Sequence, residues 1–147
     1  QESQVSYGEV VDTYWLNQYV LAREAYDWAT LQRSYDTATL LSSPDVQREY
    51  FALFEGPQAR DVVLSNSAKI DVAIRSITPD PDKGIAVVRY STTLRNSNGI
   101  TEPTEYWVAS IGYSYVNAAM TAADRRINPL GFQVTSYRRD PEVIKAN

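Results

Sequence analysis

The sequence predicts an α+β fold in which helices pack on a strongly curved, four-stranded antiparallel sheet. Apolar residues recur with helical spacing up to residue 64 and alternate with polar residues from residue 68 onward. Short turn sequences separate the alternating segments, and Asn98-Gly99 is the strongest short signal for a hairpin. Helices followed by hairpin-linked strands are typical of this fold class. At 147 residues, we expect a single domain, residues 1–147.

The first helix is predicted from Tyr7 to Trp28. Its apolar arc covers about 180°, which is wider than the ~100° stripe of an ordinary surface helix. The central stripe and its extension contain Val11, Trp15, Tyr19, Ala22 and Tyr26, with Tyr14, Leu21, Ala25 and Trp28 beside them. The charged residues predicted on the opposite, solvent side are Asp12, Arg23, Glu24 and Asp27. Two interpretations stay open and are compatible: the helix is buried in a deep sheet, or one edge of its arc meets another chain.

A clear helix start and stop follow in "SSPDVQREYFALFEG". Ser43 can cap the helix, Pro44 suits its first position, and Asp45 is favoured at the positive end of the helix dipole. Gly56 suits a left-handed cap, and Pro57 prevents continuation. Two further helical segments are predicted on either side, over residues 29–41 and 58–64.

Four strands are predicted in the second half of the chain. Their ranges are 68–77, 85–94, 104–116 and 132–138. Gly112 interrupts the longest of them, where a glycine often marks a bulge that bends a sheet. We interpret "TAADRR" (residues 121–126) as a connector before the last strand.

Composition excludes several classes of function. The chain has no Cys and no His, so it lacks a disulfide framework, the commonest general base and the commonest ligand of transition metals. A net charge of -4 argues against a nucleic-acid binder. No apolar run is long enough to span a membrane. The 11 tyrosines suit surfaces that are partly buried, including interfaces.

Motifs that carry chemistry are scarce, and we expect no cofactor and no metal. The segment from Asp80 to Gly84 resembles the start of a calcium loop but lacks the downstream ligands, so it is interpreted as a hairpin turn. Catalysis by a carboxylate is the remaining option for an enzyme, because an apolar pocket raises the pKa of a buried acid. The candidates are Asp27 and Asp36, which lie beside Trp28 and Tyr35; the alternative is that both acids face water.

The stretch "NPLGFQVTSYRRDPE" begins with a tight turn. Asn128, Pro129 and Gly131 occupy positions i, i+1 and i+3 of a type I turn. Two interpretations stay open: the turn only aims the last strand, or it exposes Leu130 as a contact. Successive residues of a strand point to opposite faces, so at most one arginine of the Arg138-Arg139 pair meets a given partner.

Three long segments of the chain resemble one known family. They are residues 7–28 ("YGEVVDTYWLNQYVLAREAYDW"), 40–56 ("LLSSPDVQREYFALFEG") and 127–142 ("INPLGFQVTSYRRDPE"). The chain resembles the VirB-eight (VirB8) family, inner-membrane assembly proteins of bacterial type IV secretion systems, and most of all its plasmid-conjugation members. The resemblance implies a cone-like fold of the nuclear-transport-factor-two-like kind and a non-enzymatic scaffold of the secretion channel.

The resemblance also implies a location and partners. The chain would be a periplasmic domain, and the cytoplasmic tail and single transmembrane helix of the family would be absent, in keeping with its start at Gln1 and with the lack of a signal-peptide pattern. It would form a weak, reversible homodimer and contact other inner-membrane and periplasmic channel subunits, without binding nucleic acid directly. By this resemblance, the family's contact sites correspond to Val11, Tyr14, Asn128, Pro129, Leu130 and Gly131, and to either Arg138 or Arg139 on the last strand.

Two alternatives compete with the scaffold. One is a cone-fold small-molecule binder or an enzyme that uses a buried carboxylate, which would require a closed apolar pocket containing an ionisable residue. The other is a purely structural domain in which the tyrosines only fill the core.

Overall fold

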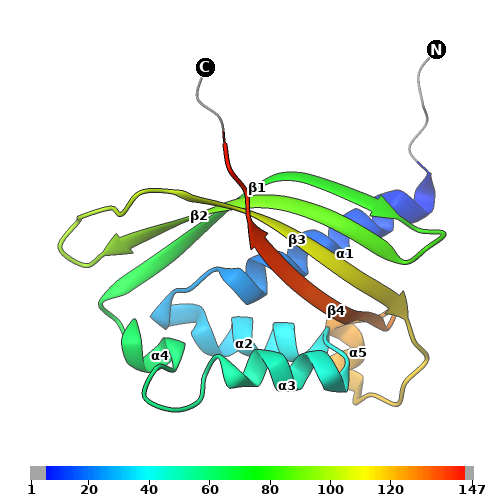
Figure 1. The fold of residues 1–147 in the computed structure, drawn as a ribbon. Coiled ribbons are helices and arrows are strands. Elements are labelled where there is room, and N and C mark those ends of the chain that lie inside the picture. Colours follow the sequence, from blue (N-terminus) through cyan, green and yellow to red (C-terminus); the bar gives the residue numbers. More distant parts are fainter. Residues whose placement is uncertain (1–5, 145–147) are drawn as a thin grey trace.

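The computed structural model describes residues 6–144 and consists of helices on one side of a four-stranded sheet (Figure 1). The helical elements are α1 (Tyr7–Glu24), the short 3-10 helix η1 (Trp28–Thr30), α2 (Leu31–Leu40), α3 (Pro44–Ala52), α4 (Arg60–Val63) and α5 (Ala122–Ile127). The strands are β1 (Ala68–Asp80), β2 (Ile85–Asn96), β3 (Glu105–Tyr115) and β4 (Phe132–Pro141). The predicted α+β class with a four-stranded antiparallel sheet is therefore confirmed.

The strands lie in the order β1-β2-β3-β4, and each pairs antiparallel with its neighbour. The register shifts twice, with Arg75 as the extra residue of β1 and Thr135 as the extra residue of β4. The second shift falls at Gly112, where the sequence predicts a bulge. A bulge bends its strand and increases the local twist. The strong curvature of the whole sheet stays a prediction.

The core lies between α1 and the inner face of the sheet. Alternate residues of β2 and β3 are buried, as the period of two predicts. Phe132 stacks between the rings of Trp15 and Tyr113, with centroid distances of 6.1 and 5.7 Å. The buried core cluster contains Trp15, Leu16, Tyr19, Val20, Leu41, Val46, Ala86, Val88, Tyr90, Ala109, Ile111, Tyr113, Phe132 and Val134.

Helix α1 ends four residues earlier than the sequence predicts. The chain becomes extended at Ala25, and the backbone of Tyr26 pairs with Ile70 of β1 through two hydrogen bonds of 3.1 and 2.9 Å. Asp27 then caps η1 by accepting a hydrogen bond from the amide of Ala29. The apolar residues keep helical spacing up to Trp28, but the backbone pairing of Tyr26 with the distant strand β1 ends the helix earlier.

The prediction that the charged residues of α1 face solvent is wrong for three of the four. Asp12, Arg23 and Glu24 are buried, with exposed fractions of 3, 7 and 7%. Tyrosine hydroxyl groups from β3 and β4 reach the two carboxylates, as described below. Burial of a charged group is tolerated when it is paired and hydrogen-bonded.

Other predicted elements hold with adjusted ends. Ser43 caps α3 as predicted, and its side chain accepts a hydrogen bond from the amide of Val46. Gly56 is left-handed as predicted, although α3 already ends at Ala52. The "TAADRR" segment is not a plain connector, because it forms α5 with Thr121 as its cap. Six residues are too few for periodicity to reveal a helix.

Hydrogen bonds made by the buried side chain of Asn128 stabilise the turn before β4. The amide of Gly131 donates to the carbonyl oxygen of Asn128 at 3.4 Å, and the Asn128 side chain bonds both backbone groups of Phe132, at 2.9 and 3.0 Å. Gly131 is left-handed, with φ +69°, and a Cβ there would overlap the carbonyl oxygen of Val116. The turn is therefore a packed structural element, and only glycine fits its last position.

We predict that Gly131→Ala lowers the free energy of unfolding by about 3 kcal/mol, since left-handed strain and a backbone overlap act together. Gly56→Ala is the matched control, because Gly56 has a similar φ of +74° but open space where a Cβ would lie. It should cost only about 1 kcal/mol. Urea denaturation measures the free energy of unfolding of both variants. Equal losses of stability would contradict the conclusion that the turn at Gly131 is tightly packed.

Candidate functional site

Exposed apolar side chains occur both on the first half of α1 and on the turn before β4. We call this set the α1–turn surface: Tyr7, Val10, Tyr14, Pro129 and Leu130. Tyr14 and Leu130 are 56% and 52% exposed, so both face outward. The rings of Tyr14, Trp15 and Phe132 connect the helix to the turn, with centroid distances of 5.0 and 6.1 Å. Both parts lie at the same end of the molecule (Figure 1).

The structure divides the predicted contact residues of this region. Tyr14, Pro129 and Leu130 are exposed, whereas Asn128 and Gly131 are buried beneath them and shape the turn. Val11 is partly buried and packs against the core.

Sequence reasoning missed two members of this surface. Tyr7 and Val10 are 88% and 55% exposed. They precede Tyr14 by seven and four residues, so helical spacing from Tyr14 would have found them.

Asp12 fastens α1 to the sheet just beneath the α1–turn surface. Its two carboxylate oxygens accept hydrogen bonds from the hydroxyl groups of Tyr113 and Tyr115 at 2.5 and 2.6 Å. Burial and then these bonds raise the pKa of both tyrosines. A hydrogen bond to a carboxylate is stronger than one between neutral groups, so this clamp holds the helix in place.

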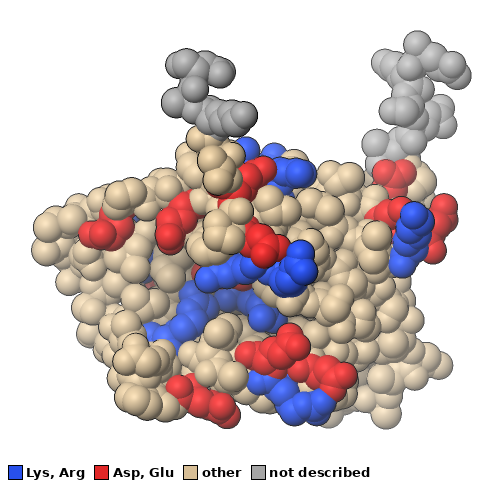
Figure 2. All heavy atoms as spheres, viewed as in Figure 1, with Lys and Arg blue, Asp and Glu red and all other residues tan. Residues whose placement is uncertain are grey.

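A groove with basic walls opens at the other end of α1. Figure 2 shows lysine and arginine side chains gathered in a hollow in the middle of this face. The groove encloses about 480 Å³. Its lining residues are Arg23, Glu24, Leu53, Arg60, Ile70, Thr92, Glu105, Trp107, Tyr137, Arg138 and Arg139.

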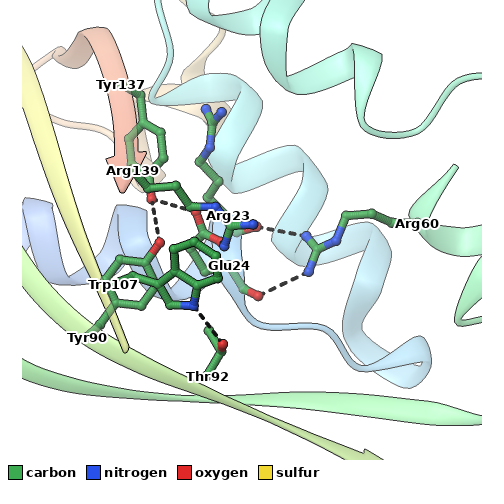
Figure 3. Close-up of polar contacts among 8 residues, drawn as sticks. All are labelled: Arg23, Glu24, Arg60, Tyr90, Thr92, Trp107, Tyr137 and Arg139. Carbon is green, nitrogen blue, oxygen red and sulfur yellow. Dashed lines mark hydrogen bonds and ion pairs between the residues drawn. The ribbon is translucent and has the colours of Figure 1, made fainter. Parts of the chain in front are cut away.

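Glu24 is the centre of the polar contacts in this groove (Figure 3). It accepts a hydrogen bond of 2.6 Å from the Tyr137 hydroxyl group and pairs with Arg139 at 3.0 Å. Burial and then the negative charge of Glu24 raise the pKa of Tyr137 well above its usual value. Burial is the largest single effect on the pKa of Arg139 and would lower it, but the charge of Glu24 together with Tyr90 and Tyr137 outweighs burial, so the pKa is raised. The Arg139 guanidinium also lies 3.9 Å from the centroid of Trp107.

Two further guanidinium groups border Glu24. Arg60 donates to the carbonyl oxygens of Arg23 and Glu24, at 2.9 and 3.1 Å, and so satisfies carbonyl groups at the end of α1 (Figure 3). Arg23 donates to the Tyr19 hydroxyl group at 3.0 Å and lies 4.0 Å from the centroid of Tyr137. Burial lowers the pKa of Arg60. Three cations therefore surround one buried carboxylate.

The two neighbouring arginines of β4 differ as predicted. Arg139 turns inward to Glu24, whereas Arg138 lies at the exposed rim and pairs with Asp140 at 3.1 Å, where its side chain is 78% exposed. The alternation of a strand separates them.

The carboxylates considered for catalysis, Asp27 and Asp36, are not buried, which favours the alternative that they face water. Asp27 caps η1 and pairs with Lys69 at 3.6 Å, and Asp36 is exposed and accepts a hydrogen bond from Gln32. Each faces solvent because the local backbone uses it as a cap or a surface partner. Among residues 6–144, Asp12 and Glu24 are the acidic residues that are buried as a whole, and both already accept hydrogen bonds from side chains.

Within residues 6–144, no group of three or more His, Cys, Asp or Glu side chains could hold a metal ion. In the same part of the chain, no helix has both the length and the apolar character needed to cross a membrane.

Comparison with known proteins agrees with this geometry. The model of the family described as "VirB8 protein" matches residues 1–142. The chain belongs to the VirB8 family. It is 46% identical over 144 residues to the type IV secretion system protein virB8 of Brucella suis, covering 97% of this chain and 60% of that relative. The chain thus spans about 60% of the length of this curated relative.

Solved structures of similar proteins share the fold. A TrwG component of a type IV secretion system from Bartonella birtlesii is 54% identical, with a TM-score of 0.92 and coverage of 99% of this chain and 100% of that one. TraE, solved in complex with 2-chloroisonicotinic acid, is 40% identical, with a TM-score of 0.85 and coverage of 95% and 100%. The family match and the virB8 relative confirm the predicted family. The similarity to the TrwG and TraE structures confirms the predicted nuclear-transport-factor-two-like fold.

We predict that the two arginines of β4 differ in their effect on stability. Arg139→Gln should lower the free energy of unfolding by about 2 kcal/mol, because it leaves Glu24 buried without its cation. Arg138→Gln should cost less than about 0.5 kcal/mol, as for other exposed ion pairs. Parallel urea denaturation of the two variants makes the comparison, and losses of similar size would refute the central role of Glu24.

Proposed function

We propose that this chain is the periplasmic part of a VirB8-type assembly protein of a type IV secretion channel. It acts as a non-enzymatic scaffold that self-associates and contacts other inner-membrane and periplasmic channel subunits. A transmembrane helix and a cytoplasmic tail, outside this chain, anchor it on the periplasmic side of the inner membrane. Membership of the VirB8 family supports this role. Donor groups already engage both buried carboxylates, which supports a structural rather than a catalytic use of them.

The α1–turn surface is the observation on which self-association depends. Apolar side chains exposed together on a rigid support are typical of interaction sites. The support is rigid here because the Asp12 clamp holds α1 and the Asn128 side chain holds the turn. The occupant that we propose is a second copy of the chain. A patch formed by five residues is small, which favours a weak and reversible dimer.

We predict that Tyr14→Asp and Leu130→Asp each weaken dimerisation at least about tenfold, because a buried charge without a partner is costly. Sedimentation velocity over a wide range of protein concentrations measures the effect. Val62→Asp is the control, since Val62 is 61% exposed on α4, away from this surface, and should leave the dimer unchanged.

The same variants in the full-length protein should reduce conjugative transfer of DNA, whereas the Val62 control should not. A wild-type chain that stays strictly monomeric at about millimolar concentration would rule out self-association through this surface.

The basic groove favours a second candidate function, binding of a small carboxylate. The lining of the groove includes Arg23, Arg60 and Arg139. Guanidinium groups bind carboxylates well because they match them in charge and in hydrogen-bond geometry. The crystallised complex of TraE with 2-chloroisonicotinic acid supports such a ligand class.

We predict that 2-chloroisonicotinic acid shifts the amide signals of Glu24 and Arg139 in NMR titrations. The neutral amide of the same acid is the matched control, and it should bind at least about fivefold more weakly because it has no negative charge and cannot form an ion pair with the arginines. Equal binding of acid and amide, or shifts only at distant residues, would exclude a carboxylate site in this groove.

A further inference from the structure

A second pocket lies between η1, the start of α2, the segment after α3, and α4. We call it the α2–α4 pocket, and it encloses about 500 Å³. Its lining residues are Trp28, Leu31, Gln32, Tyr35, Phe54 and Asp61. Figure 1 shows α4 and α5 at opposite ends of the helical layer, so this pocket is remote from the turn that follows α5.

Aromatic rings form the walls of the α2–α4 pocket. Tyr35 and Phe54 stand almost perpendicular to each other, at 89°, with their centroids 5.1 Å apart. Trp28 is 51% exposed, which is unusual for so large an apolar side chain. The face of an aromatic ring carries partial negative charge and attracts cations, and Trp attracts them most strongly.

Asp61 adds a carboxylate whose hydrogen bonding is incomplete. Its Oδ1 atom is buried and has no hydrogen-bond partner within the described part of the chain. A buried acceptor without a donor costs free energy, and a charged acceptor costs more. Arg60 precedes Asp61, but its guanidinium group already donates to the carbonyl oxygens of Arg23 and Glu24.

The surroundings of the α2–α4 pocket are also negative. The lining contains one carboxylate and no Lys or Arg. The pKa of the Tyr35 hydroxyl group is raised, first by burial and then by the negative charges of Asp36 and Glu55, which lie nearby. A ligand that complements this pocket is therefore cationic and fits against aromatic rings.

We propose that the α2–α4 pocket binds an arginine side chain from a basic segment of a partner protein. The planar guanidinium group stacks on aromatic faces and presents several N–H donors, so it suits both the rings and the carboxylate residue that lines the pocket, Asp61. A quaternary ammonium group, such as that of choline, has no N–H and cannot donate a hydrogen bond to a carboxylate. The N–H donors, and not the charge alone, therefore favour the guanidinium group of a basic peptide over a choline headgroup.

This binding is separate from self-association. None of the residues lining the α2–α4 pocket belongs to the α1–turn surface. A chain that dimerises but does not bind arginine would refute only the present proposal, and the reverse result would refute only the self-association proposal.

The test is an NMR titration of the ¹⁵N-labelled chain with the peptide acetyl-Gly-Arg-Gly-amide. Two other probes serve as controls: the same peptide with neutral citrulline in place of arginine, and choline. The arginine peptide should shift the indole N–H of Trp28 and the backbone amide of Asp61, and the citrulline peptide should bind at least about tenfold more weakly, because it lacks the charge. Equal binding of the two peptides, or tighter binding of choline, would overturn the proposal.

Substitutions test which side chains of the α2–α4 pocket bind the arginine peptide. Asp61→Asn should weaken binding of the arginine peptide at least about tenfold, whereas the control Asp36→Asn, outside the lining, should change it less than about twofold. Trp28→Leu removes a half-exposed ring and should weaken binding about threefold, as expected for one cation–π contact. Thermal unfolding checks that each variant folds. If Asp61→Asn fails to fold, Trp28→Leu alone decides, and unchanged binding there refutes the proposal.

Discussion

The buried carboxylate of Glu24 is the interaction on which the arrangement of the elements depends. It lies at the last residue of α1 and binds two side chains of β4, so it joins the first helix to the last strand. A carboxylate in this position is stable only with its donors in place, because an unpaired buried charge is far more costly than a paired one. Arg60 completes the junction by bonding the carbonyl groups at the end of the helix.

A second carboxylate fastens the opposite end of α1. Asp12 binds the hydroxyl groups of Tyr113 and Tyr115, so polar clamps hold the helix at both ends, with an aromatic and aliphatic core between them. Tyrosine is suited to this role, since its ring fills apolar space and its hydroxyl group reaches a carboxylate. The abundance of tyrosine therefore reflects the attachment of α1 to the sheet as much as exposure at an interface.

Three surfaces follow from this support. The α1–turn surface lies above the Asp12 clamp, the basic groove surrounds Glu24, and the α2–α4 pocket has a separate lining beside α4. They differ in character: apolar, cationic, and aromatic with a carboxylate. A scaffold that contacts several partners benefits from such differences, because specificity requires that one partner does not fit the site of another.

The sequence by itself determined the fold class, all four strands, the cap at Ser43 and the bulge at Gly112, because these features depend on residues that are close in sequence. It also placed Arg138 and Arg139 on opposite faces of a strand. Only the tertiary structure decided that α1 stops at Glu24, that its charged residues are buried, and that Asn128 supports the turn from inside. The partners of Asp12 and Glu24 are about a hundred residues away in the chain. No local pattern records such a partner, so helical spacing alone assigned these carboxylates to solvent.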